Sequence, residues 1–486
     1  MSLVWLCTFE AARLALRFML LVLGVHFVRA AWTGLRESDP KRPPEPEAWP
    51  SVTVQLPVRN EFYVAERVLR RAAALDYPKN KLRLQVLDDS DDETTARVEG
   101  AAAELREQGF DVQVLHRDAP TGYKAGALNA GLQATDSELV AMFDADCVPG
   151  PDFLKRVVPY FQETRVGCVQ VRWGFLNRGH SLLTRLQAMV LDGLFAIDQF
   201  ARAARRLPLQ FNGTNGMWRR ETLDDVGGWR GEILAEDADL SFRAHLRGWR
   251  LVHLRRYAVP TELPEDMAAF RAQQHRWSLG SAQLLRSLGW QAAISPLALR
   301  EKAMMFMHLG RHGIDPLIVM VAITSPLTTL YELPFLLDYT VTVNGGLLGL
   351  VGLGCMLFYG AALRYVGAPR THWMLIPLVI PLAIGMSLTY SIAFATGLLR
   401  RGGRFVRTPK AGNEDAEGPR YRTRGSWWVV LEFLIAGGHA YFTVVAASRG
   451  LWVEAAFFLL FAASFGWVAL ATWASRGVGE RGPDEA

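Results

Sequence analysis

Two aspartates, Asp144 and Asp146, follow a short apolar run that begins at Leu139 and ends at Phe143. A run of this length and composition predicts a buried β-strand. In open α/β folds the carboxyl ends of the strands face the crevice where ligands bind. Carboxylate oxygens at such a place suit Mg²⁺ or Mn²⁺, with substrate phosphates completing the coordination shell. Two acids that simply end a strand at the surface are the plainer alternative, and this pair alone leaves it open.

A second acidic pair, Asp88 and Asp89, follows another short apolar run in the same way. The pattern of apolar residues predicts strands over 51–56, 84–87, 112–115 and 139–143, with helical spacing over 61–74 and 125–134. Strands that alternate with helices indicate an α/β domain with a mostly parallel sheet and helices on both faces. The carboxyl ends of parallel strands meet at one edge, so both acidic pairs should lie on the same rim.

The composition of the 486-residue chain is uneven. Residues 51–290 are composed like a soluble domain, whereas 313–398 and 427–474 are long apolar tracts. This pattern is typical of a membrane enzyme with a domain outside the bilayer. The net charge of +5 is modest and gives no indication of nucleic-acid binding. The four cysteines show no paired spacing, so neither a zinc site nor a disulfide framework is indicated.

The apolar tracts and their flanking charges predict a membrane topology. Residues 14–28 form a first hydrophobic segment with no small-residue cleavage site after it. Further apolar segments of spanning length occupy 313–337, 345–366, 373–399, 427–447 and 451–475. The loop from Arg400 to Arg424 carries eight Lys and Arg and should be cytoplasmic, whereas 337–345 carries none and should lie outside. Trp373–Leu399 contains Pro377 and Pro381, and we interpret it as broken, re-entrant or partly interfacial, which gives five crossings and an outside N-terminus.

The expected organisation is a transmembrane helix (1–30), a Pro-rich linker (31–50), a cytosolic α/β domain (51–290), an interfacial helix (291–312), membrane helices with a broken segment (313–398), a cytosolic loop (399–426), a transmembrane hairpin (427–475) and a tail (476–486). The α/β domain is thus inserted between transmembrane helices.

Several motifs occur in one order along this chain: Leu56-Pro57-Val58-Arg59-Asn60-Glu61, Asp88-Asp89-Ser90, Gly122-Tyr123-Lys124-Ala125-Gly126-Ala127-Leu128-Asn129, Phe143-Asp144-Ala145-Asp146, Phe211-Asn212-Gly213-Thr214-Asn215-Gly216 and Ala235-Glu236-Asp237. Together they resemble the family-2 inverting glycosyltransferases, which implies a GT-A type α/β domain. Gln273-Gln274-His275-Arg276-Trp277 and Phe405-Val406-Arg407-Thr408-Pro409-Lys410 resemble the QxxRW signature and gating loop of the processive cellulose synthase branch. The motifs of this domain most resemble those of the cellulose-synthase-like mannan and glucomannan synthases.

The resemblance assigns roles to the acidic motifs and to the lysine between them. Asp144 and Asp146 would hold the metal that bridges the diphosphate of the donor. Asp88 and Asp89 would face the nucleotide base and ribose, with no means of choosing between them, and Lys124 would contact phosphate oxygens at a helix start. Asp237 is the expected general base, although an acid at a helix N-terminus is an alternative explanation for it. The family usually has threonine before this Glu-Asp pair, and this chain has Ala235.

The resemblance also assigns substrate contacts farther along the chain. Arg276 would pair with the donor diphosphate and Trp277 would stack on the acceptor sugar, although a packing tryptophan beside a helical salt bridge is the alternative. The remaining expected substrate-binding residues are Glu61, Asn212, Gly213, Thr214, Glu236, Gln273, Arg407, Thr408 and Lys410. A simple basic surface loop is the alternative for the last three.

The favoured hypothesis is a membrane-embedded processive β-glycosyltransferase, an inverting hexosyltransferase that extends and extrudes a β-linked polysaccharide. Its expected partners are a nucleotide-sugar donor, the growing glycan and the lipid bilayer, with export or envelope proteins left open. The donor, GDP-mannose or UDP-glucose, is not fixed by any motif. A glycosyltransferase that adds one sugar to a lipid carrier is an alternative, and a non-catalytic subunit of an envelope complex is another. The expected location is the membrane, the inner membrane if the source is bacterial, with the catalytic domain cytoplasmic.

Overall fold

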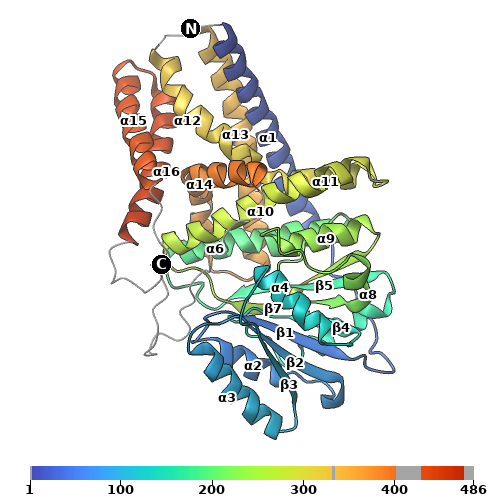
Figure 1. The fold of residues 1–486 in the computed structure, drawn as a ribbon. Coiled ribbons are helices and arrows are strands. Elements are labelled where there is room, and N and C mark those ends of the chain that lie inside the picture. Colours follow the sequence, from blue (N-terminus) through green and yellow to red (C-terminus); the bar gives the residue numbers. More distant parts are fainter. Residues whose placement is uncertain (1–2, 331–333, 401–427, 476–486) are drawn as a thin grey trace.

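The computed structural model describes residues 3–330, 334–400 and 428–475, which form a sheet domain and a set of long helices (Figure 1). The strands are β1 (Val52–Val58), β2 (Leu82–Asp88), β3 (Asp111–His116), β4 (Leu139–Met142), β5 (Val166–Phe175), β6 (Gly216–Arg219) and β7 (Arg250–Thr261). The helices of the sheet domain are α2 (Ala65–Ala73), α3 (Thr94–Glu107), α4 (Tyr123–Gln133), α5 (Phe153–Val157), α6 (Leu182–Asp192), a π-helical turn η3 (Gly193–Asp198), α7 (Gln199–Ala204), α8 (Arg220–Asp225) and α9 (Glu236–Leu246). The long helices are α1 (Leu3–Arg36), α10 (Met267–Ile294), α11 (Leu299–Leu309), α12 (Ile314–Leu330), α13 (Pro334–Tyr365), α14 (Val379–Leu399), α15 (Val429–Ser448) and α16 (Trp452–Ala474).

The sheet has seven strands in the order β3-β2-β1-β4-β6-β5-β7. All neighbours pair in parallel except β6, which is antiparallel to both β4 and β5. The predicted mostly parallel sheet is therefore confirmed, and the sequence patterns missed only its last three strands. The antiparallel β6 has a consequence for the site, because it brings the residues before Gly216 to the carboxyl end of β4.

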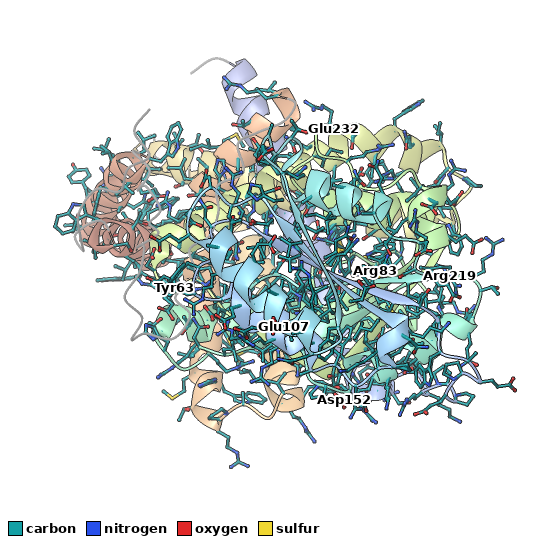
Figure 2. All side chains as sticks on the ribbon, turned by 60° about the horizontal axis from the view of Figure 1, so that its bottom comes forward. Tyr63, Arg83, Glu107, Asp152, Arg219 and Glu232 are labelled. Atoms are coloured by element: carbon teal, nitrogen blue, oxygen red, sulfur yellow. The ribbon has the colours of Figure 1, made fainter. Side chains whose placement is uncertain are left out.

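Alternate residues of each central strand pack against different helices, as the two-residue period of a strand requires. In β4, Leu139 and Ala141 join a core with α2 and α3, whereas Val140 and Met142 join one with α4, α8 and α9. A strand buried on both faces must be apolar at every position, which explains its continuous apolar sequence. In Figure 2 Tyr63, just beyond the carboxyl end of β1, lies on the opposite side of the view from Arg83 and Arg219, which stand at the amino-terminal edge of the parallel strands.

The long helices take two directions in Figure 1: α1, α12, α13, α15 and α16 extend away from the sheet, whereas α10 and α14 lie across them. Among the described residues, five helical segments are long and apolar enough to span a membrane: Ala11–Arg36, Gly346–Tyr365, Arg370–Leu399, Val429–Ser448 and Trp452–Ala474. Five candidate spans equal the five crossings expected from the sequence, but they are not the same five segments. The candidate spans include 370–399 and omit α12, which has only 17 residues.

Three expected boundaries differ from the structure. The linker expected from residue 31 begins after Arg36, because α1 continues while Ala30, Ala31 and Thr33 are buried. The outside loop expected at 337–345 is helical, since α13 already starts at Pro334, a residue well suited to the first helical position. The interfacial helix expected at 291–312 is instead the end of α10 followed by α11 and a 3₁₀ turn, η4 (Arg311–Gly313).

The segment expected to be broken consists of a 3₁₀ helix, η5 (Arg370–Leu378), followed by the regular α14. The 3₁₀ part contains Pro377, which cannot donate an α-helical hydrogen bond. α14 packs closely along α10: the Ser278 hydroxyl donates to the Tyr390 carbonyl at 2.9 Å, and a Cβ on Gly397 would lie 2.4 Å from the Leu279 carbonyl oxygen. Whether 373–399 crosses the bilayer stays a prediction.

A buried ion pair joins the C-terminal hairpin to α10. Arg271 donates to Glu432 Oε2 at 2.7 Å, to Thr472 Oγ1 at 3.1 Å and to Thr389 Oγ1 at 2.8 Å. Arg271 and Glu432 are almost completely buried. A charged pair in this position cannot be hydrated, so each partner depends on the other for its stability.

Replacement of Arg271 by methionine should therefore destabilise the protein, by roughly 3–5 kcal/mol, because Glu432 would remain buried without its partner. The double variant R271M/E432M should recover a large part of that loss, since it removes both charges. Thermal unfolding of the purified protein in detergent measures both. A double variant no more stable than R271M would show that the ion pair is not what holds the hairpin to α10.

Candidate active site

The carboxyl ends of β2, β1 and β4 open onto a cavity of about 270 Å³. Twelve of the residues expected at the site line this cavity: Glu61, Asp89, Lys124, Asp144, Asp146, Asn212, Gly213, Glu236, Asp237, Gln273, Arg276 and Trp277. Asp88 and Thr214 lie behind its wall. Arg407, Thr408 and Lys410 lie outside the described residues.

Lys124 lies at the centre of the cavity wall. It is the second residue of α4, and its Nζ atom pairs with the Asp144 carboxylate and donates to the Gly213 carbonyl at 2.9 Å. Burial alone would lower the pKa of Lys124, but the carboxylates of Asp144, Glu236 and Asp237 outweigh it and raise the pKa. The ammonium group is therefore firmly charged and joins α4, the end of β4 and the 212–216 turn.

The two aspartates after β4 have different surroundings. Asp144 is partly exposed to the cavity, and its backbone N–H donates to Thr214 Oγ1 at 2.8 Å. Asp146 is nearly buried, and its Oδ2 atom accepts hydrogen bonds from the Thr261 hydroxyl and from the Glu262 N–H at 2.9 Å. Thr214 thus holds the backbone of Asp144 instead of facing the cavity.

The structure gives Asp88 and Asp89 different surroundings. Both oxygens of Asp88 are occupied inside the protein: Oδ1 accepts from the Ser90 N–H at 3.0 Å, and Oδ2 lies 2.7 Å from Thr95 Oγ1 and 2.9 Å from His116 Nδ1. Asp89 instead lines the cavity, where Arg117 holds it with two hydrogen bonds of 2.7 and 2.6 Å. Of the two, only Asp89 is placed to meet a ligand.

Glu236 and Asp237 occupy the first turn of α9, where the free N–H groups favour negative charge. Asp237 Oδ1 accepts from the Ala238 N–H at 2.7 Å. Gly213 faces the other oxygen: its φ of +77° suits glycine, and a Cβ there would lie 3.2 Å from Asp237 Oδ2. Burial, opposed by Lys124 and reinforced by Asp144, raises the pKa of Asp237 to about 6. Burial and the charge of Asp237 raise the pKa of Glu236 to about 7.

α10 supplies the opposite wall of the cavity with Gln273, Arg276 and Trp277. The indole of Trp277 is partly buried against a cluster that includes Leu263 and Phe195. The start of α9 is fixed to the same helix. The Leu234 N–H donates to Gln283 Oε1 at 3.0 Å, and a Cβ on Gly280 would lie 2.7 Å from the Ala235 Cβ. The small residue at 235 therefore belongs to the contact that sets α9 against α10.

Several polar residues at the cavity were not singled out from the sequence as site residues, among them Arg59, Gln210, His308 and Arg311. His308 is near the end of α11 and Arg311 begins η4, so both reach the cavity from the segments that follow α10. The Arg311 Nε atom is buried and lacks a hydrogen-bond partner among the described residues. Nothing in the local sequence marked these two, since their position depends on how α11 folds back over the sheet domain.

No three His, Cys, Asp or Glu side chains of the described part of the chain converge as a ready-made metal site. Asp144 and Asp146 both line the cavity, and carboxylate oxygens are the ligands that Mg²⁺ and Mn²⁺ prefer. Two protein carboxylates fit a cation whose remaining ligands come from substrate phosphates and water. The donor set therefore suits a metal shared with a ligand.

Comparison with known proteins identifies the sheet domain. Residues 50–280 match a family model described as "Glycosyltransferase like family 2", so the chain contains a domain of that family. Over 245 residues it is 41% identical to glucomannan 4-beta-mannosyltransferase 2 of Arabidopsis thaliana, an alignment covering 49% of this chain and 46% of the relative. It is 38% identical over 260 residues to a probable glucomannan 4-beta-mannosyltransferase 9 of Oryza sativa subsp. japonica, covering 52% and 49%. The chain thus spans about half the length of the curated relatives it matches.

A solved mannosyltransferase from Pyrobaculum calidifontis, in complex with GDP-Man and Mn²⁺, superposes with a TM-score of 0.51. The match covers 79% of this chain and 99% of that one, at 20% identity. At this level of identity the likeness shows a shared fold and nothing finer.

The raised pKa values of Asp237 and Glu236 predict the pH dependence of transfer. A general base must be deprotonated, so kcat/KM should fall as the pH drops through about 6 to 7, and not near 4, where an exposed aspartate titrates (about 3.9). In E236Q only Asp237 would titrate, so the fall should be confined to about pH 6 and its upper part near pH 7 should be lost. A pH–rate profile of both proteins measures this, and a wild-type limb near pH 4 would contradict the assignment of these carboxyls.

Proposed function

We propose that this protein is a membrane-embedded inverting hexosyltransferase that builds a β-linked polysaccharide from a nucleotide sugar. The observation that carries the proposal is the position of Asp237, a carboxylate with a raised pKa, between the cations Lys124 and Arg276 and the aromatic Trp277 around one cavity. A base, phosphate-binding cations and a sugar-stacking indole are the parts that glycosyl transfer requires.

In the proposed reaction the acceptor hydroxyl attacks the anomeric carbon of the donor from the side opposite the diphosphate. Asp237 Oδ2 takes the proton of that hydroxyl, because Oδ1 is already bonded to the Ala238 N–H. The new C–O bond forms as the bond to the diphosphate breaks, and the anomeric configuration is inverted. An α-linked donor therefore yields a β-linkage.

The leaving nucleoside diphosphate takes the electron pair of the broken bond, and Lys124 and Arg276 offset its growing charge. Asp144 and Asp146 would hold Mg²⁺ or Mn²⁺, and such a cation, when bound, supplies further neutralisation of the diphosphate. Lys124 already pairs with Asp144 and lies close to where these phosphates would be placed. Asp89 is the residue we assign to the nucleoside, since it lines the cavity and Asp88 does not.

The acceptor is assigned to the side of the cavity formed by Trp277, Trp173 and Phe195. A flat indole matches the apolar face of a β-linked hexose. Mannose is the favoured sugar and GDP-mannose the favoured donor, because the curated relatives are glucomannan mannosyltransferases. The catalytic domain is assigned to the cytoplasmic side of the membrane. Transfer of a single sugar to a lipid carrier is the alternative, and it yields a glycolipid instead of a polymer.

Purified protein supplied with radiolabelled GDP-mannose or UDP-glucose should form an insoluble polymer with one of them. In D237N the product should fall by about 10²–10⁴-fold while donor affinity changes little, because the amide keeps the shape of the carboxylate but cannot accept a proton. N212A, which also alters the cavity wall, is a control that keeps the base and should retain far more activity. Retention of more than about a tenth of wild-type turnover by D237N would show that another group is the base.

Replacement of Asp144 or Asp146 by asparagine should abolish transfer together with the divalent-metal dependence of donor binding, because carboxylate charge retains a hard cation. Donor affinity measured by calorimetry with and without Mn²⁺ tests this apart from turnover. If metal-dependent binding persisted in both variants, the cation would have to bind elsewhere.

A further inference from the structure

A second groove, with a cavity volume of about 360 Å³, lies where α1 meets the sheet domain and α11. The groove is lined by Leu21, Val22, Val25, His26, Arg29, Ala30, Thr33, Asp198, Ala201, Arg202, Arg205, Leu207 and Met307. Apart from Arg202, which reaches toward His308, none of these residues belongs to the reaction described above. The groove therefore needs its own explanation.

One wall of the groove is apolar and open. Leu21, Val22 and Val25 lie on α1 inside a segment long and apolar enough to span a membrane, and these residues are 43%, 37% and 42% exposed. Exposed aliphatic side chains on such a helix face lipid chains. Arg29 lies eight residues beyond Leu21 on the same helix, about 12 Å farther along its axis, toward the sheet domain.

Arginine residues line the other end of the groove. The side chains of Arg29 and Arg205 are exposed, and neither has an ion-pair partner within the described residues. Arg202 is 2% exposed and pairs with Asp198 Oδ2 at 2.8 Å, while its Nε atom makes no hydrogen bond in the described structure. With His26 counted as neutral, three arginines face a single carboxylate, so two positive charges are unbalanced.

We propose that this groove binds an anionic phospholipid from the leaflet next to the catalytic domain. The phosphate of the headgroup would lie between Arg29 and Arg205, and an acyl chain would follow Val25, Val22 and Leu21 along α1. Charge complementarity identifies the occupant: a neutral lipid would leave the two arginines unbalanced, and a soluble phosphate would leave the apolar wall uncovered. Clusters of basic residues next to a membrane segment bind anionic headgroups through the same electrostatic attraction.

The groove is connected to the active-site cavity by a chain of polar contacts. His26 Nε2 lies 2.8 Å from Asp198 Oδ1, Asp198 pairs with Arg202, and Arg202 Nη1 lies 3.4 Å from His308 Nδ1. His308 Nε2 pairs in turn with Gln210 Oε1, and both of these residues line the active-site cavity. A headgroup that orders Arg202 would therefore also order one wall of the active site.

Binding is tested on the full-length protein purified in detergent, by native mass spectrometry with phosphatidylglycerol and phosphatidylcholine in equal amounts. The wild type should retain phosphatidylglycerol preferentially, and R29Q/R205Q should lose roughly 10- to 30-fold of that preference, since each arginine contributes about 1 kcal/mol. R300Q is the matched control, because Arg300 is exposed at the start of α11 but lies outside the groove. Unchanged preference in R29Q/R205Q, or an equal loss in R300Q, would overturn the proposal.

A competition experiment distinguishes a phospholipid from other phosphate-containing ligands. An isoprenyl phosphate or inorganic phosphate that displaces phosphatidylglycerol at equimolar concentration would show that a phospholipid is not the natural occupant. In nanodiscs, transfer by the wild type should rise when phosphatidylglycerol replaces a quarter of the phosphatidylcholine, and transfer by R29Q/R205Q should not. Because the binding measurement needs no donor or turnover, it stands even if the proposed transfer reaction fails.

Discussion

The site depends on one buried ammonium group surrounded by carboxylates. Lys124 contacts Asp144 and the Gly213 carbonyl, and its charge also acts on Glu236 and Asp237. Without a cation there, three acids would share a poorly hydrated space, and their repulsion would push them apart or force them to bind protons. The charge of Lys124 does not fully offset the effect of burial, which leaves Asp237 with a raised pKa. A carboxylate that remains ionised near neutrality and yet accepts a proton readily suits general-base chemistry.

The fold supplies this balance by bringing together segments that are distant in sequence. The antiparallel β6 returns the 212–216 turn to the end of β4, where Thr214 fixes the backbone of Asp144. α10 then closes the cavity, because Gln283 and Gly280 fix the loop that begins α9 while Arg276 and Trp277 face the cavity. A single helix therefore sets both the position of Asp237 and that of the groups opposite it.

The sequence was sufficient for the parts of the site that follow short strands. Asp89, Asp144 and Asp146 could be placed on one rim because apolar runs marked their strands and parallel pairing aligned the strand ends. The sequence was insufficient where the position of a side chain depends on tertiary packing. The burial of Asp88 and Thr214 depends on partners many residues away, and His308 and Arg311 reach the cavity only because α11 folds back over the domain. The 337–345 segment was expected to be an outside connection because it carries no Lys or Arg, although the absence of these residues does not prevent helix formation.

The ion pair between Arg271 and Glu432 also affects when the protein can complete its folding during synthesis. The two residues are 161 positions apart, so a ribosome that adds 5–20 residues per second needs roughly 10–30 s to supply the glutamate after the arginine. During that interval α10 carries a charge without its partner, and the helix that bears Arg276 and Trp277 lacks the contact that fixes it to the hairpin. The contact that fixes α10 to α15 can therefore form only after α15 has been synthesised.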